Sequence, residues 1–403
     1  MPGDPVVTGL GAIGPWGLGR EPLAAALASG RPIGIEVDRA SGFHRDRSAR
    51  RAALVPPIDL GRWLPPAQAR RMAAPSRWSV AAARMALEDA GLPSAASRRA
   101  CVVMATAFGS VLFTERLVRQ VIEEGPEAAQ PFYFSECVAN AAAAQVGLSV
   151  EARGANVTIT QHEAGPLLAL AHAAAEVREG RADLALAGAT DEMTPLLHAL
   201  LDRYGALARE APGRAEAPRP FDRRRDGFLA GEGAVVLVVE RETAARARGA
   251  RMLARIANSA SAFDPTATES DWGTGDVGLA AALLAAWQRD GFDSGAITGV
   301  VSGASGARRG DALEGRVLRR AWGENALPPV VAPKGVVGEY GGGILGSALA
   351  AVGGAPFGAL ESVEEQDPAV RIGLHAGALP PGAILVTALA AGGAAAWVVL
   401  ERP

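Results

Sequence analysis

Two apolar segments of nearly the same sequence end the two halves of the chain, and they constrain its fold more than any other feature. Residues 234–241 read Ala-Val-Val-Leu-Val-Val-Glu-Arg, and residues 395–402 read Ala-Ala-Trp-Val-Val-Leu-Glu-Arg. Upstream of each lies another apolar run that ends in small residues, at 184–189 in the first half and 300–304 in the second. Self-similarity of this kind indicates the internal duplication of one structural unit.

Ala-rich helical patterns alternate with these apolar runs. Such alternation is typical of an α/β protein whose mixed sheets are covered by helices. Residues 167–175 are apolar on all sides, as a helix packed between two sheets would be. We place the boundary between the halves at Gly249, which gives units 1–249 and 250–403, and we interpret residues 209–219 as a surface loop of the first unit. The predicted helices cover residues 78–90, 167–178, 279–288 and 313–321.

A strand-to-helix turn without a nucleophile is the main indication of function. Residues 156–159 have the pattern of a strand and residues 167–178 that of a helix, so Glu163 lies at the tip of the turn between them. Enzymes that use such an elbow place a nucleophile such as Ser or Cys at its tip. A glutamate there can be a charge, a base or a hydrogen-bond acceptor, but it is a poor acyl carrier because an acyl-carboxylate anhydride would hydrolyse.

Composition argues against several classes of function. The 403-residue chain has a formal net charge of −3 with scattered arginines, which gives little support for nucleic-acid binding. Cys101 and Cys137 lack metal-binding or disulfide spacing, and we expect neither a metal nor a cofactor. The glycines at 9 and 11 and at 341–343 are interpreted as tight turns rather than nucleotide-binding loops. Without a membrane-spanning run or a signal-peptide pattern, the protein is expected to be cytoplasmic.

Three motifs resemble those of the β-ketoacyl synthases, the condensing enzymes of fatty-acid and polyketide assembly. They are the opening segment 6–15 (Val-Val-Thr-Gly-Leu-Gly-Ala-Ile-Gly-Pro), residues 183–189 after the elbow, and residues 219–228 (Arg-Pro-Phe-Asp-Arg-Arg-Arg-Asp-Gly-Phe) followed by Gly-Glu-Gly-Ala at 231–234. The resemblance covers essentially the whole chain. It implies the thiolase fold, a duplicated five-layered αβαβα architecture with two mixed sheets, in agreement with the repeat.

The chain differs from active members of this family at the catalytic positions. Active members use an elbow cysteine, two histidines that assist decarboxylation of a malonyl unit, and a gating phenylalanine near the C-terminus. The aligned positions here are Glu163, Gly303, Glu339 and Ala391, and Lys334 is retained. A second negative charge at Glu339 would oppose the developing enolate, and Gly303 offers no side chain, so neither replaces a histidine.

The resemblance therefore implies a chain-length factor, the catalytically silent partner of a ketosynthase heterodimer. Such a subunit completes the acyl tunnel of its catalytic partner and meets the phosphopantetheine-bound chain of an acyl carrier protein through the complex. Glu163-Ala164-Gly165 is similar to the Gln-Ala-Gly of those subunits. A buried carboxylate is costly, so we expect Glu163 to be protonated or to pair with Lys334, within a cluster that also contains Glu339.

Tunnel-lining residues are expected after the strand at 101–106. In the family the following helix crosses the dimer interface, and here Phe113, Thr114 and Leu117 share one face of it. Phe108 precedes this helix, and Phe134 lies in the next matching segment, 131–140. Phe113, Thr114 and Leu117 are each equally well interpreted as ordinary residues of a dimer core. The aromatic residues of 131–140 are expected partly to line the tunnel and partly to pack beneath it, with Phe134 nearest the tunnel.

Two other hypotheses remain open. The chain can be a homodimeric scaffold that keeps the fold and binds an acyl ligand or carrier protein without turnover. A ketosynthase that uses Glu163 as a base is disfavoured by the charge argument. The remaining histidines do not rescue activity, because His162 is expected to point away from the elbow tip, and His44, His172, His198 and His375 show no partner spacing.

Overall fold

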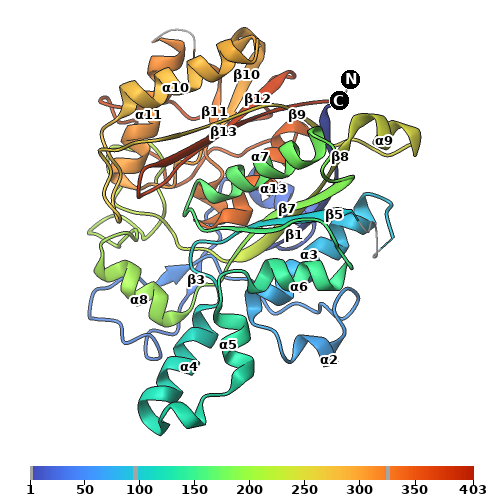
Figure 1. Ribbon diagram of the computed structural model, residues 1–403. Coiled ribbons are helices and arrows are strands. Elements are labelled where there is room, and N and C mark those ends of the chain that lie inside the picture. Colours follow the sequence, from blue (N-terminus) through green and yellow to red (C-terminus); the bar gives the residue numbers. More distant parts are fainter. Residues whose placement is uncertain (1–2, 94–98, 324–326) are drawn as a thin grey trace.

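The computed structural model describes residues 3–93, 99–323 and 327–403 (Figure 1), so Met1 and Pro2 lie outside the described residues. The main sheet has the strand order β11-β10-β12-β13-β9-β1-β8-β7-β5-β6, with β2 paired to β1. The strands of the first half are β1 (Pro5–Gly14), β5 (Ala100–Ala105), β6 (Asn156–Ile159), β7 (Leu184–Asp191) and β8 (Gly233–Arg241). Those of the second half are β9 (Ala254–Phe263), β10 (Ile297–Val301), β11 (Val330–Val331), β12 (Ala383–Leu389) and β13 (Ala394–Glu401).

The two halves have the same topology, which confirms the predicted duplication. The order β6-β5-β7-β8-β1 in one half matches β11-β10-β12-β13-β9 in the other, strand for strand along the chain. In both, the first three strands of that order are parallel and the last two join by antiparallel pairing. The repeated apolar segments form β8 and β13, which occupy equivalent places. The halves join edge to edge where Val6 and Val7 of β1 pair with Arg255 and Ala254 of β9.

Helices and sheets form the expected five layers (Figure 1). Helices α3 (Ala74–Asp89) and α6 (Ala141–Ser149) cover the outer face of the first half-sheet, and α10 (Asp276–Arg289) and α11 (Arg308–Trp322) cover that of the second. Between the half-sheets lie α7 (Gly165–Arg178) and α13 (Gly341–Val352), whose apolar side chains share one core cluster with strands of both halves. Gly249, the predicted boundary, lies in the turn between α9 (Glu242–Ala247) and β9.

All four predicted helices are present, but the interpretation of the glycines as tight turns is wrong. Gly9 and Gly11 lie inside β1, where a Cβ would come within 2.0 and 1.9 Å of carbonyl oxygens of α3. The glycines at 341–343 open α13, and a Cβ on Gly341 would come within 2.9 Å of Ala189 in β7. In both places glycine permits helix and sheet to approach closely.

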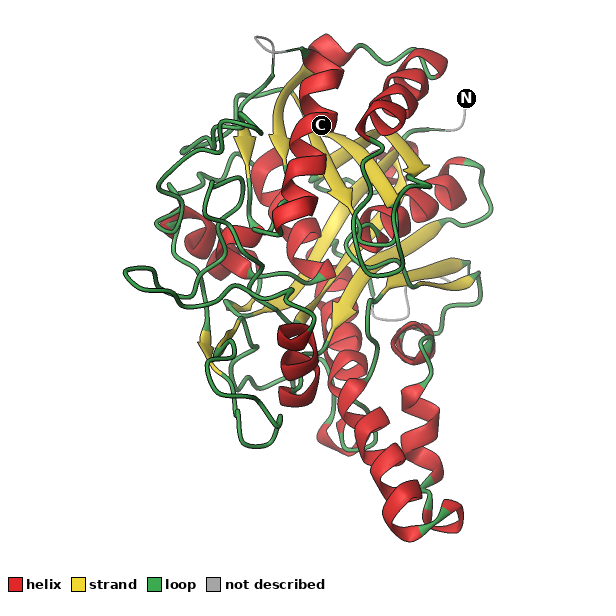
Figure 2. Ribbon diagram, turned by 90° about the vertical axis from the view of Figure 1, so that its left-hand side faces the viewer, coloured by secondary structure: helices red, strands yellow, loops and turns green. Residues whose placement is uncertain are grey.

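A helical arm projects from the layered body, as both views show (Figures 1 and 2). It consists of α4 (Val111–Glu124), the short 3-10 turn η1 (Pro126–Ala128) and α5 (Pro131–Cys137). Several large apolar side chains on this arm are exposed. They are Val118, Val121, Ile122, Phe132 and Phe134.

Shorter elements complete the described chain, and no helix within the described ranges is long and apolar enough to cross a membrane. These elements are α1 (Arg20–Ser29), α2 (Pro66–Ala69), α8 (Pro195–Arg203), α12 (Lys334–Val337), β2 (Gly17–Leu18), β3 (Ile35–Glu36), β4 (Arg51–Ala52) and η2 (Ser294–Ala296).

Gly11→Ala should lower the free energy of unfolding by about 3 kcal/mol, because the added Cβ meets the Ala82 carbonyl of α3 and the backbone must move. Gly278→Ala in α10 is the matched control, since nothing lies within 4 Å of its Cβ position. The control should be neutral or more stable by up to about 1 kcal/mol. Urea denaturation measures both, and equal stability of the two variants would contradict the packing argument.

Candidate functional site

The elbow forms as its sequence predicts. Strand β6 ends at Ile159 and α7 begins at Gly165, and the Gly165 N–H donates to the Gln161 carbonyl at 2.5 Å to close the turn. Pro166 occupies the first turn of α7, where its missing N–H costs nothing. Glu163 lies in this turn, half-buried, and its Oε2 accepts the backbone N–H of Ala391 at 3.2 Å. Two of the predicted degenerate positions are therefore in contact.

Lys334 is the only lysine among the 40 lysine and arginine residues of the sequence. Its side chain is 1% exposed, and Nζ lies 2.6 Å from Oε1 of Glu339. Glu339 is held by the backbone, because its N–H donates to the Leu229 carbonyl at 2.7 Å and its carbonyl accepts the Gly231 N–H at 3.0 Å. The direct ion-pair partner of Lys334 is thus Glu339, while Glu163 interacts electrostatically with both.

One ammonium group faces more than one buried carboxyl group. Burial and the charge of Glu339 raise the pKa of Glu163 to about 7, against the opposing effect of Lys334. Burial likewise raises the pKa of Glu314 to about 8, and Asp311 adds to this while Ser302 and Lys334 oppose it. Near neutral pH, Glu314 is therefore mostly protonated and Glu163 is divided between its two forms. The described site thus combines one ammonium group with carboxyl groups that are partly protonated near neutral pH.

Gly303, the position predicted to align with the first histidine, has no space for a side chain. Gly303 follows β10, and its N–H donates to Oε1 of Glu314 at 3.1 Å. A Cβ at this position would lie 2.7 Å from the Thr387 carbonyl oxygen and 3.0 Å from the Ala388 Cα, both on β12. Because these are backbone atoms, any side chain here would require β12 to move.

The cavity beside the elbow is small. Its volume is about 40 Å³, and Glu163, Glu339, His162, Phe108 and Tyr340 are among the residues that line it. This space accommodates a few water molecules and no acyl thioester. His162 was expected to point away, but it lines the same cavity, with its ring edge-on to Phe108 at a centroid distance of 6.1 Å.

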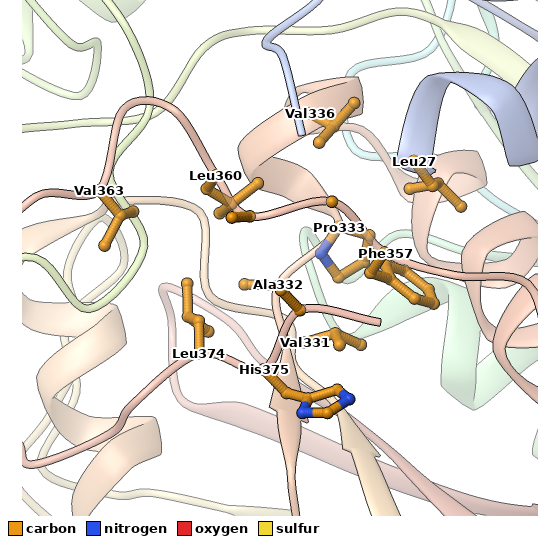
Figure 3. Close-up of a pocket in the computed structure, with 13 residues that line it drawn as sticks. Leu27, Val331, Ala332, Pro333, Val336, Phe357, Leu360, Val363, Leu374 and His375 are labelled. Carbon is orange, nitrogen blue, oxygen red and sulfur yellow. The ribbon is translucent and has the colours of Figure 1, made fainter. Parts of the chain in front are cut away.

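A larger pocket is lined in part by Pro333 and Val336, which flank Lys334 in the sequence (Figure 3). It has a volume of about 160 Å³, and its lining side chains, which include Val331, Val336 and Phe357, are apolar except for His375. Its one ionisable side chain among the described residues, His375, has Nε2 3.2 Å from the Ala378 carbonyl. No polar constellation for catalysis converges there.

The predicted tunnel residues are separated in the single chain. Phe108 lines the elbow cavity, whereas the other four lie on the arm. Phe113 is buried against Phe132 and Tyr133 of α5, Leu117 is half-buried, and Thr114 and Phe134 are exposed. Phe113 therefore packs the two helices of the arm together, and of the five residues only Phe108 lines the elbow cavity.

Sequence reasoning missed two features that involve residues distant in the chain. Glu314 is buried on the sheet-facing side of α11, and a carboxylate on an apolar helix face was the signal that could have revealed it. His44 and His198 were expected to lack partners, yet His44 Nε2 lies 2.8 Å from His198 Nδ1. They are 154 positions apart in the sequence, so no local sequence pattern predicts their contact. Among the described residues no group of three metal-ligating side chains is arranged to bind an ion.

The duplicated topology and the elbow between β6 and α7 define a thiolase-fold protein of the ketosynthase type. Residues 4–245 match the family described as β-ketoacyl synthase, N-terminal domain, and the chain belongs to this family. It is 30% identical to 3-oxoacyl-[acyl-carrier-protein] synthase 2 of Vibrio cholerae over 335 residues, covering 81% of this chain and 79% of that protein.

Other relatives come from polyketide assembly. The chain is 32% identical over 362 residues to the tetracenomycin polyketide synthase ketoacyl synthase alpha subunit of Streptomyces glaucescens, covering 86% of this chain and 83% of that one. A solved structure described as the ishigamide ketosynthase/chain length factor superposes with a TM-score of 0.87 and 27% identity, with full coverage of both chains.

Glu163→Gln should make the protein more stable at alkaline pH. The folded-state pKa of about 7 exceeds the ordinary value of 4.5, so wild-type stability falls as the pH rises between these values, and the cost of the buried charge persists above them. The variant lacks this loss. The difference in unfolding free energy between variant and wild type should therefore change by about 2 kcal/mol in favour of the variant from pH 5 to pH 8. Denaturant unfolding at both pH values measures it, with exposed Glu124→Gln on α4 as control. A pH-independent difference would refute the assignment.

Lys334→Met should destabilise the protein by about 3–5 kcal/mol, because it leaves Glu339 buried without its cation. The double variant Lys334→Met/Glu339→Gln should recover much of this loss, since both charges are then removed together. A double-mutant cycle on the unfolding free energies measures the coupling. Additive effects of the two substitutions would contradict a buried ion pair.

Proposed function

We propose that this chain is a chain-length factor, the non-catalytic subunit that pairs with a ketosynthase which elongates carrier-protein-bound acyl chains by decarboxylative Claisen condensation. The observation that carries the proposal is the charged elbow, in which Glu163 occupies the nucleophile position and accepts the Ala391 N–H. Condensation requires a thiolate to hold the acyl chain and donors to stabilise an enolate. Neither Glu163 nor Glu339 supplies a thiolate, the ionised carboxylate of Glu339 opposes an enolate, and Gly303 has no space for a donor side chain.

The two cysteines do not replace the missing nucleophile. Cys101 is buried in β5, where burial raises the pKa of its thiol to about 12. Cys137 ends α5 on the arm, and burial also raises the pKa of its thiol. Neither lies at the elbow, and both favour the unreactive protonated form.

The arm supports pairing with a second chain. Ile122 is 76% exposed, Phe134 65% and Val118 50%, on helices that project from the body. Contiguous exposed apolar side chains mark interaction surfaces in soluble proteins. The polyketide relative named as an alpha subunit and the structure named ketosynthase/chain length factor support a ketosynthase as the second chain.

The tunnel assignment follows from this pairing and belongs to the proposal. Thr114 and Leu117, on the face of α4 that begins with Phe113, would meet the partner's acyl chain once the arm is covered. Phe108 beside the elbow cavity and Phe134 at the surface of α5 would contribute at the two ends of that path. The acyl carrier protein would reach the complex through the catalytic subunit.

Co-expression with a cognate ketosynthase tests the proposal. Size-exclusion chromatography should give a one-to-one complex, and condensation of carrier-bound substrate should require both chains. Ile122→Glu should abolish the complex and the activity, whereas Val277→Glu on the outer face of α10, which is 61% exposed, should leave both intact. A stable homodimer that ignores the ketosynthase would instead favour the scaffold hypothesis. Condensation by this chain alone would refute both.

A further inference from the structure

A cavity of about 390 Å³ lies away from the elbow and is lined by arginines from distant parts of the chain. We call it the arginine pocket, defined by Arg31 after α1, Arg51 of β4, and Arg214 and Arg219 of the loop before β8. None of these residues lines the elbow cavity. The pocket is therefore a separate site, and its role does not depend on the proposed function.

Some of the charges in the pocket already have partners. Arg31 pairs with Glu361 at 2.7 Å and Arg214 with Asp226 at 2.5 Å. Glu364, also in the lining, pairs with Arg224 at 3.0 Å. The remaining carboxylate, Glu216, accepts the backbone N–H groups of Arg50 and Arg51 at 2.7–3.0 Å. Every acidic group of the lining is thus engaged.

Two guanidinium groups of the pocket have no carboxylate within 4.0 Å among the described residues. Arg51 donates to the Gly34 carbonyl. Arg219 donates to the carbonyls of Ala217 and Ala215, both at 2.8 Å. Carbonyl oxygens satisfy donors but do not neutralise a positive charge.

Arg219 is the less well compensated of the two. It is 3% exposed, and its buried Nε has no hydrogen-bond partner among the described residues. Burial and the like charges of Arg214 and Arg224 lower its pKa, against the opposing effect of Asp226 and Asp222 at longer range. A buried cation that has no carboxylate within 4.0 Å and an unpartnered donor is costly unless an anion joins it.

We propose that the arginine pocket binds a small oxyanion, the phosphate or carboxylate group of a metabolite, through Arg219 at its base and Arg51 at its rim. The planar guanidinium fork suits such an anion, with N–H donors directed at two oxygens. The volume admits several further ligand atoms beyond the anionic group. The wall residue Leu229 accepts the N–H of Glu339, so the occupied pocket would adjoin the elbow through one backbone hydrogen bond.

Calorimetric titration of the full chain with inorganic phosphate and, separately, with succinate tests this inference, using chloride at matched ionic strength as reference. Saturable binding of either anion, with a raised melting temperature, is the expected result. Phosphate alone would identify a phosphate-bearing ligand, succinate alone a carboxylate, and both an oxyanion site without that distinction. Absence of saturable binding, or a response equal to that of chloride, would overturn the proposal.

Substitutions of the pocket arginines test whether the anion binds in the arginine pocket. Arg51→Met and Arg219→Met should each weaken the binding by roughly tenfold or more, the effect of losing one charge-assisted hydrogen bond. Arg402→Met is the matched control, because this exposed arginine also donates to a backbone carbonyl, that of Gly353, and lies outside the pocket. If Arg219→Met does not fold, exposed Arg51 decides the matter alone. Equal affinities of Arg51→Met and Arg402→Met would overturn the assignment.

Discussion

The elbow depends on the buried positive charge of Lys334. It lies among Glu339, Glu163 and Glu314, and only Glu339 forms a direct ion pair with it. A compact point charge can serve several carboxyl groups from one position, whereas the planar fork of arginine is restricted to fewer directions. That difference gives a physical reason for the single lysine in an otherwise arginine-based chain to lie here. Burial raises the pKa values of the other two carboxyl groups, so near neutral pH Glu314 is mostly protonated and Glu163 partly protonated.

The scaffold and the chemistry of this protein are separable. Strand β6, the turn and helix α7 place residue 163 where a nucleophile would lie, and the β12–β13 turn still offers it the Ala391 N–H. The same geometry that would activate a thiolate here stabilises a carboxyl group. At Gly303, the position predicted to align with the first histidine, the approach of β12 leaves no space for a side chain. Restoring one catalytic residue would therefore not restore the site.

Sequence patterns predicted those parts of the structure that depend on local periodicity. The segment 167–175, apolar except for His172, identified the central helix α7. The paired segments 234–241 and 395–402 identified the duplication, because equivalent strands face equivalent neighbours. The tip position of Glu163 followed from the strand and helix that flank it. These features need only the residues next to them.

The features that the sequence did not reveal depend on contacts between distant segments. The helix α13 begins with glycines that disfavour a helix in isolation, and its packing against β7 and β8 compensates for that preference. Glu339 is the direct partner of Lys334 because backbone hydrogen bonds to Leu229 and Gly231 fix the position of Glu339. Sequence spacing does not predict these hydrogen bonds. The arginine pocket likewise forms only when residues 31–51, 213–219 and 361–364 meet.

Intact-mass spectrometry of the assembled complex is the most direct test of the central claim, that Glu163 marks a subunit without an acyl-carrying nucleophile. The complex would be incubated with an acyl carrier protein thioester, denatured without reducing agent, and both chains weighed. The account predicts an acyl adduct on the ketosynthase partner and an unchanged mass for this chain. A stoichiometric acyl adduct on this chain would contradict it.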